Sequence, residues 1–252
     1  MRALLLTLLL GFAGVNVAQG QALLIILFGD KLSTEKFQLG INADLVWSSL
    51  TGTGEASTRF SWAFGAYGEI KLSERWRLQP ELTIKTPAGA SRLPYDTPGS
   101  PFSDPTGDPT LDSIAINGTV TRSANYLTLP LMVKYVAGRF TFGAGGSVGI
   151  LTGASDELIS DVDRGGLSLK ASSTDSLNTF DAGLIGSLSF MLKPKLQMRS
   201  LRIDAKFYYG LTNTVKSNTG DAIRNWQLFV GLDIPVGGSK SAEGADEPEE
   251  NE

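Results

Sequence analysis

The chain contains no cysteine and no histidine among its 252 residues. Without cysteine it has no disulfide, no thiolate metal ligand and no lipid-modified N-terminal cysteine. Without histidine it lacks the commonest general base and the commonest metal ligand. Histidine-dependent acyltransferase, lipase and protease mechanisms are therefore excluded. We expect no catalytic residue, cofactor or metal site, although an all-carboxylate glycosidase remains formally open.

A basic face is also missing, which argues against a nucleic-acid partner. The formal net charge is −4. Residues 237–252 hold six acids and one lysine, so the rest of the chain carries about +1. This low-hydrophobicity, acidic stretch predicts a disordered tail.

The only long apolar run lies at the N-terminus and predicts export. Arg2 precedes the apolar stretch of residues 3–15, and Ala18-Gln19-Gly20 provides small residues for cleavage before Gln21. We therefore expect a signal peptide at residues 1–20. The alternative is a single uncleaved anchor helix, but Asn16 and Gln19 interrupt the run before about 20 apolar residues are reached.

Strict alternation of apolar and polar residues follows, and it predicts β-strands. It occurs eight times and defines a domain at residues 36–236. The expected strands are Lys36–Ser48, Arg59–Leu72, Trp76–Lys85, Asn125–Val136, Phe140–Leu151, Thr179–Leu192, Leu201–Leu211 and Trp226–Pro235.

The connections between these strands alternate in length. Residues 73–75, 137–139 and 193–198 are short, whereas residues 49–58, 86–124, 152–178 and 212–225 are long. Short turns at one end and long loops at the other are typical of an outer-membrane barrel. The fold class we predict is all-β, an eight-stranded antiparallel up-and-down transmembrane β-barrel with short periplasmic turns and long extracellular loops.

The two faces of the strands differ in chemistry. One face is rich in glycine and serine and carries charges of both signs, whereas the other carries large aliphatic and aromatic residues. Eight strands enclose room for side chains only, so the smaller, polar face is expected inside. The predicted interior charges are Asp44, Glu69, Arg77, Glu81, Lys85, Lys134, Asp181, Arg202, Asp204, Lys206 and Asp233.

Charges in such an interior must pair or lose their charge. Two interpretations follow: a network of salt bridges that fills the barrel, or a narrow gated path for ions or solutes. Glu81 and Lys134 lie on adjacent predicted strands, and we expect them in one cluster.

Aromatic residues of the apolar face gather near strand ends, as in the girdles of a membrane barrel. The predicted outer girdle is Trp47, Phe60, Trp62, Phe180, Tyr209 and Trp226. The predicted inner girdle is Phe37, Trp76, Tyr135, Phe140 and Phe190.

Several segments resemble the PorT-like outer-membrane β-barrel family of Gram-negative bacteria. They are LFGDKLSTEKFQLGINADL (27–45), LQPEL (78–82), NYLTLPLMVKY (125–135) and YYGLTN (208–213). The resemblance covers about residues 22–235. It implies a compact barrel of about eight strands and a link to protein secretion at the cell surface, and it brings no catalytic residues.

Three further segments bear on function. Residues 21–35 join the cleavage site to the first strand, and Ala22–Phe28 is too short to span a membrane, so an interfacial segment or a plug of the periplasmic mouth is expected. The alternative is a disordered start. The acidic stretches at 103–112, with Asp104, Asp108 and Asp112, and at 155–166 predict calcium sites only weakly, because neither has the ligand density of a calcium loop.

Taken together, the sequence predicts a non-enzymatic outer-membrane barrel with a structural or surface-interaction role. Its partners would be membrane lipid and a protein that contacts loops 86–124 and 152–178. The alternatives are a narrow channel or small-solute transporter, and an exported soluble ligand-binding barrel.

Overall fold

The computed structural model describes residues 33–54, 56–103, 117–162, 165–216, 220 and 222–237. The expected signal peptide, most of segment 21–35, the three aspartates at 104, 108 and 112, and the acidic tail beyond residue 237 lie outside the described residues. No helix in the described part of the chain is long and apolar enough to span a membrane.

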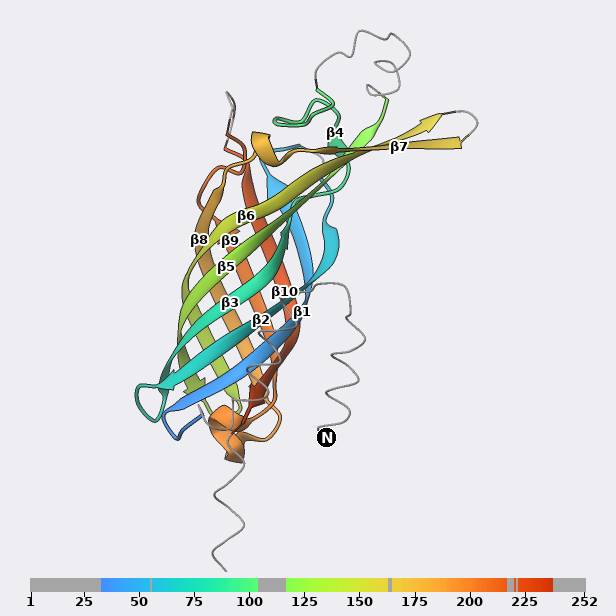
Figure 1. Ribbon diagram of the computed structural model, residues 1–252. Coiled ribbons are helices and arrows are strands. Elements are labelled where there is room, and N and C mark those ends of the chain that lie inside the picture. Colours follow the sequence, from blue (N-terminus) through green and yellow to red (C-terminus); the bar gives the residue numbers. More distant parts are fainter. Residues whose placement is uncertain are drawn as a thin grey trace, which may run out of the picture.

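Ten strands and two short 3-10 helices make up the described part of the fold (Figure 1). The strands are β1 Phe37–Thr51, β2 Arg59–Lys71, β3 Trp76–Ala88, β4 Leu93–Pro94, β5 Thr119–Ala137, β6 Phe140–Val162, β7 Gly165–Ser172, β8 Phe180–Met191, β9 Arg202–Gly210 and β10 Arg224–Val236. The helices are η1 Thr174–Ser176 and η2 Pro194–Arg199.

Eight of these strands close into an antiparallel barrel. The order around the ring is β1, β2, β3, β5, β6, β8, β9 and β10, and β10 pairs with β1 along thirteen residues from Leu39–Val236 to Thr51–Arg224. Each expected strand coincides with one strand of the ring. The prediction of an eight-stranded up-and-down barrel is confirmed.

The long-loop end contains more strand than the sequence alternation predicts. β5 and β6 continue beyond the ring, and β4 and β7 flank them to give a four-stranded sheet in the order β4, β5, β6, β7. Figure 1 shows this sheet projecting from one rim. Parts of the segments expected as loops, residues 86–124 and 152–178, are therefore strands.

The polar face of the strands lies inside the barrel, as expected. Lys134 and Arg202 are fully buried, whereas Leu129 and Phe180 on the outer face are 54% and 67% exposed. This distribution is the inverse of that in a water-soluble barrel, so the outside of the ring requires an apolar surrounding.

Two bulges change the face to which a strand directs its side chains. In β3 the pairing with β5 shifts by one residue between Thr83 and Thr86. In β6 one extra residue lies between Leu151, which faces Tyr126 of β5, and Gly153, which faces Asn125. One extra residue in a strand reverses the alternation beyond that point. The alternation in the sequence therefore fails at the upper ends of β3 and β6.

Glycines inside the barrel make room for large neighbours. Gly40 lies directly opposite Tyr67 in the β1–β2 register, and a Cβ at Gly40 would collide with the Tyr67 ring. Gly143 lies opposite Lys134, and a Cβ there would collide with the Ser187 hydroxyl and press on the Lys134 side chain. Both positions require glycine because a bulky polar side chain fills the space above their backbone.

Candidate functional site

Five charged side chains link opposite walls of the barrel in its lower half. The carboxylate of Glu69 contacts the guanidinium groups of both Arg77 and Arg202. Arg202 Nε lies 3.6 Å from Asp233 Oδ2, and Lys134 Nζ lies 3.8 Å from the same oxygen. These side chains are at most 2% exposed, so their charges interact with little screening by water.

A second group surrounds Lys206. Its Nζ lies 3.3 Å from Asp44 Oδ2, 3.3 Å from Glu81 Oε2 and 3.8 Å from Asp204 Oδ2. Polar neighbours support the carboxylates: Asn42 and Gln79 donate to Glu81 at 3.2 and 2.6 Å, and the Ser189 hydroxyl donates to Asp204.

Together the two groups contain four cations and five carboxylates. They use nine of the eleven residues predicted for the interior. These are Arg77, Lys134, Arg202 and Lys206 with Asp44, Glu69, Glu81, Asp204 and Asp233.

Three details differ from the sequence expectation. Glu81 pairs with Lys206, whereas Lys134 pairs with Asp233, so the two residues that were expected in one cluster belong to different groups of ion pairs. Lys85 lies on the outer face, because the β3 bulge places it opposite the outward Phe64. Asp181 lies inside but apart from the network and accepts a 2.6 Å hydrogen bond from the Thr212 hydroxyl.

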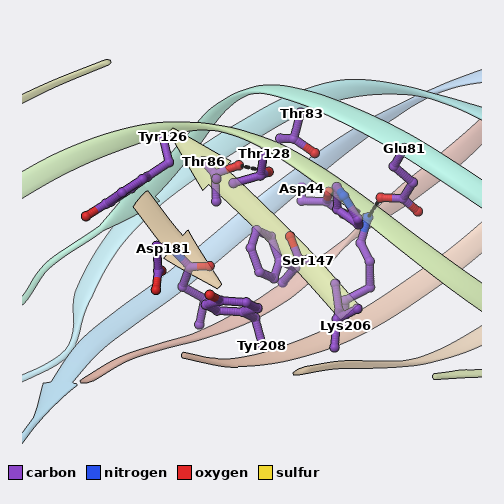
Figure 2. Close-up of a pocket in the computed structure, with 15 residues that line it drawn as sticks. Asp44, Glu81, Thr83, Thr86, Tyr126, Thr128, Ser147, Asp181, Lys206 and Tyr208 are labelled. Carbon is purple, nitrogen blue, oxygen red and sulfur yellow. Dashed lines mark hydrogen bonds and ion pairs between the residues drawn. The ribbon is translucent and has the colours of Figure 1, made fainter. Parts of the chain in front are cut away.

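A narrow cavity lies above the Lys206 group (Figure 2). Its lining includes the carboxylates of Asp44, Glu81 and Asp181 and the rings of Tyr126 and Tyr208. Figure 2 shows Lys206 closing one side of the cavity together with Asp44 and Glu81. Below this level the ion network occupies the interior.

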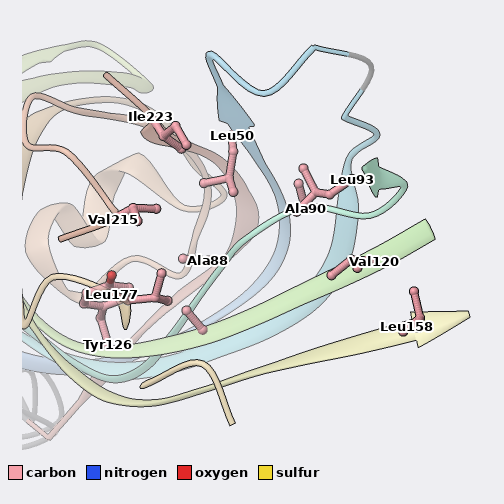
Figure 3. Packing of buried hydrophobic residues seen from close by; sticks show 11 residues of the cluster. Leu50, Ala88, Ala90, Leu93, Val120, Tyr126, Leu158, Leu177, Val215 and Ile223 are labelled. Carbon is pink, nitrogen blue, oxygen red and sulfur yellow. The ribbon is translucent and has the colours of Figure 1, made fainter. Parts of the chain in front are cut away.

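An apolar cluster lies at the long-loop end of the barrel (Figure 3). It combines wall residues with residues of the loops between strands, so the loops pack on one another and on the rim. Its buried members are Leu50, Ala88, Ala90, Leu93, Val120, Ala124, Tyr126, Leu158, Leu177, Val215 and Ile223. The mouth is therefore covered by packed side chains.

A buried ion pair fixes the projecting sheet beside this cluster. Arg122 Nε and Nη2 donate to the two carboxylate oxygens of Asp156 at 3.0 and 2.7 Å, and Arg122 Nη1 donates to Pro98 O at 2.9 Å. Ser173 adds a hydrogen bond of 2.9 Å to Asp156. Sequence reasoning missed this pair because it treated residues 86–124 and 152–178 as loops, although the alternation of Val120, Arg122 and Ala124 was available.

The aromatic residues predicted as girdles lie on the outer face near strand ends. Trp47 and Phe60 pack at 5.3 Å between ring centroids at the long-loop end. Trp76 packs on Tyr135 at 5.0 Å, and Phe140 packs on Phe190 at 5.4 Å, at the short-turn end. The remaining members, Phe37, Trp62, Phe180, Tyr209 and Trp226, belong to the ring strands. Contact of these rings with lipid headgroups stays a prediction.

A closed eight-stranded ring with a charged, filled interior and an apolar exterior defines a transmembrane β-barrel. The sequence matches the family described as "Outer membrane protein beta-barrel domain" over residues 18–216. The chain belongs to this family, and it is located in the outer membrane, in contact with lipid, with its long loops extracellular. No curated protein matches the sequence.

Three solved structures of outer-membrane proteins are similar to this chain. Ail, the attachment invasion locus protein of Yersinia pestis, is 10% identical, with 81% of this chain and 100% of Ail covered and a TM-score of 0.40. The neisserial surface protein A is 10% identical, with 79% and 96% covered and a TM-score of 0.36. The outer membrane protease OmpT of Escherichia coli is 8% identical, with 80% and 96% covered and a TM-score of 0.32.

Proposed function

We propose that the protein is a closed, non-enzymatic outer-membrane barrel that acts through its extracellular surface. The observation that carries this proposal is the ion network in the lower half of the lumen. It reaches from β2 and β3 through Arg202 to Asp233 on β10 and Lys134 on β5. A filled interior leaves the outside of the barrel and its loops as the surfaces that can meet a partner.

The extracellular end supports an interaction role in a second way. Loops that would otherwise sample many conformations are packed on the apolar cluster and tied by the Arg122–Asp156 pair. An ordered surface binds a partner at a lower entropic cost than a flexible one. The protein partner would contact β7 and the loops around β4.

Recording of ionic current across planar lipid bilayers tests whether the barrel lumen is closed. The purified protein should give no steady single-channel steps, because passage would require moving buried ion pairs. Recording the Lys206→Ala and Asp44→Ala double variant under identical conditions provides a comparison in which the upper part of the network is opened. Regular steps from the wild-type protein would contradict a closed barrel.

The cavity favours a second candidate, a narrow gated path for small cations. It carries Asp44, Glu81 and Asp181 against the single cation Lys206 among its lining residues. Under this alternative the wild-type protein would conduct, and Asp181→Asn would lower its preference for cations. The bilayer recording therefore separates the two functions.

We also propose that the interaction at the extracellular surface assists protein secretion, since the sequence resembles the PorT-like family. Deleting the gene should then reduce the set of proteins displayed on or released from the cell surface, as measured by quantitative proteomics of surface and medium. Re-expression of the wild-type chain should restore them. An unchanged surface proteome would leave the interaction role without the secretion role.

A further inference from the structure

The two ends of the barrel carry opposite net charges. In the sequence, the four long segments between the predicted strands hold eleven acids and six basic residues. The three connections at the short-turn end, residues 72–75, 138–139 and 192–201, hold five basic residues and one acid. The acid, Glu74, pairs with Lys71 of β2 at 2.8 Å and so does not neutralise these cations. The five basic residues form a basic rim, which consists of Arg75, Arg139, Lys193, Lys195 and Arg199.

Two arginines of the basic rim are directed toward the outer face of the barrel. Arg75 is exposed, and its Nη1 donates to the Tyr135 hydroxyl at 3.1 Å. Arg139 is also exposed, and its Cζ lies 6.0 Å from the centroid of the Phe190 ring. Both aromatic residues belong to the predicted inner girdle on the outer face, where each packs on a second ring. These contacts place two guanidinium groups on the side of the rim that meets the membrane.

The two arginines lie at neighbouring strand ends. The backbone carbonyl of Arg75 accepts a 2.8 Å hydrogen bond from Val136 N of β5, and β5 joins β6 through the turn that contains Arg139. The strands β3, β5 and β6 are consecutive in the ring. Adjacent strands are about 4.8 Å apart, so the backbones of the two arginines are about 10 Å apart. Their side chains are long enough to contact one lipid headgroup between them.

The connection between β8 and β9 adds cations and apolar side chains to the rim. Lys193 and Lys195 are exposed. Leu192 and Leu196, which alternate with them, are 42% and 50% exposed. The carbonyl of Arg139 accepts a 2.8 Å hydrogen bond from the last residue of β8, so this connection begins directly beside the β5–β6 turn. Figure 1 shows it at the end of the barrel opposite the projecting sheet. Basic residues interleaved with exposed leucines are typical of a segment that contacts a membrane surface.

The charge of the basic rim is not compensated within the described part of the chain. None of its five cations forms a salt bridge there, whereas the four cations of the lumen network each have a carboxylate partner. Two anions are available at this end of the barrel: phospholipids of the periplasmic leaflet, and the acidic residues 237–252 that follow β10 in the sequence. The contacts of Arg75 and Arg139 with the girdle favour the lipid, because they direct both side chains to the membrane side.

We propose that the basic rim binds the headgroup of an anionic phospholipid in the periplasmic leaflet, with Arg75 and Arg139 in contact with the phosphate. Arginine binds phosphate oxygens through two parallel hydrogen bonds, and basic residues close to a membrane surface attract anionic lipids. The acyl chains would lie along the outer face beside the Trp76–Tyr135 and Phe140–Phe190 pairs. The binding is independent of whether the lumen conducts and of any protein partner at the extracellular end.

Native mass spectrometry of the full-length protein tests the site. The protein is released from micelles that contain equal amounts of phosphatidylglycerol and phosphatidylcholine with the same acyl chains. The wild type should retain phosphatidylglycerol at least about fivefold more than phosphatidylcholine. The double variant Arg75→Gln, Arg139→Gln should lose this preference. The double variant Arg75→Lys, Arg139→Lys should keep it, because the positive charges remain.

The matched control is the double variant Arg92→Gln, Lys170→Gln, which removes two exposed cations from the extracellular end. It should retain phosphatidylglycerol as the wild type does. The heat-modifiable band on gels should be present in all variants, which shows that each barrel is folded. Equal retention of both lipids by the wild type, or an equal loss in the control variant, would overturn the proposal.

A chain shortened to end at residue 237 separates the lipid from the acidic tail as the anion at the rim. The shortened chain should prefer phosphatidylglycerol to the same extent as the full-length chain. A preference that is present only in the shortened chain would show that the tail occupies the basic rim, and it would contradict lipid binding by the complete protein.

Discussion

At the scale of single residues, Arg202 joins the two parts of the lower network. It contacts Glu69 on one side, approaches Asp233 on the other, and lies 5.4 Å from the Tyr67 ring. A buried charge that loses its partner is much less stable than a charge in water. The stability of the barrel should therefore depend more on this side chain than on any exposed cation.

We expect Arg202→Met to lower the free energy of unfolding by about 3–5 kcal/mol, because it leaves Glu69 and Asp233 with one cation each. Urea unfolding in lipid vesicles, followed by tryptophan fluorescence, measures the change. Arg75→Met is the control, since Arg75 is exposed and donates a 3.1 Å hydrogen bond to the Tyr135 hydroxyl at the periplasmic turn. Equal effects of the two substitutions would contradict a structural role for the network.

The interior residues were largely predictable from the sequence, but their pairing was not. Alternation alone places Asp44, Glu69 and Arg202 on one face. Which carboxylate meets which cation depends on strand register, shear and side-chain length, so the sequence did not reveal that Glu81 pairs with Lys206 and Lys134 with Asp233. Lys85 was assigned to the wrong face because a one-residue bulge leaves no mark in the alternation.

At the scale of elements, the extension of β5 and β6 beyond the membrane is the main feature that the sequence reading missed. The residues there alternate less strongly, and serine and threonine occupy the outer face at Thr121, Ser123 and Ser155. Once outside the lipid, a strand no longer needs an apolar outer face, so the pattern used to detect strands disappears. The apolar inner face at Val120 and Leu158 remains.

Leu158→Asp should loosen the extracellular loops while leaving the barrel folded, because it places an unpaired charge in the apolar cluster. We expect faster cleavage by trypsin on intact outer membranes, for example at the exposed Arg92, with the heat-modifiable band unchanged. Leu169→Asp is the control, because Leu169 faces Leu158 in the register yet is 40% exposed. Similar cleavage rates for both variants would show that the cluster does not order the loops.

At the scale of the whole molecule, the barrel carries its charges inside and its apolar surface outside. The closed ring of eight strands leaves no free edge within the membrane. The described turns at the periplasmic end are short, so the strands are held in fixed register. Because the ion pairs lie inside this ring, water reaches them little and screens them little.

Stability should accordingly depend little on ionic strength. Raising NaCl from 0.1 to 1 M shortens the screening length from about 10 to 3 Å, but only for charges that water reaches. We expect the free energy of unfolding in vesicles of neutral lipid to change by less than about 1 kcal/mol, which is the upper range for exposed pairs such as Lys71–Glu74. A decrease of several kcal/mol would show that water and ions enter the network.

The pairing of glycines with bulky polar side chains has a consequence for how such a barrel can change over time. Gly40 faces Tyr67 and Gly143 faces Lys134, and a Cβ at either glycine would meet side-chain atoms, those of Tyr67 or those of Ser187 and Lys134. Because the volume of the lumen is set by the number of strands, enlarging one member of a pair is tolerated only when the other shrinks. In related sequences, a larger residue in place of one of these glycines should therefore occur together with a smaller residue at the facing position.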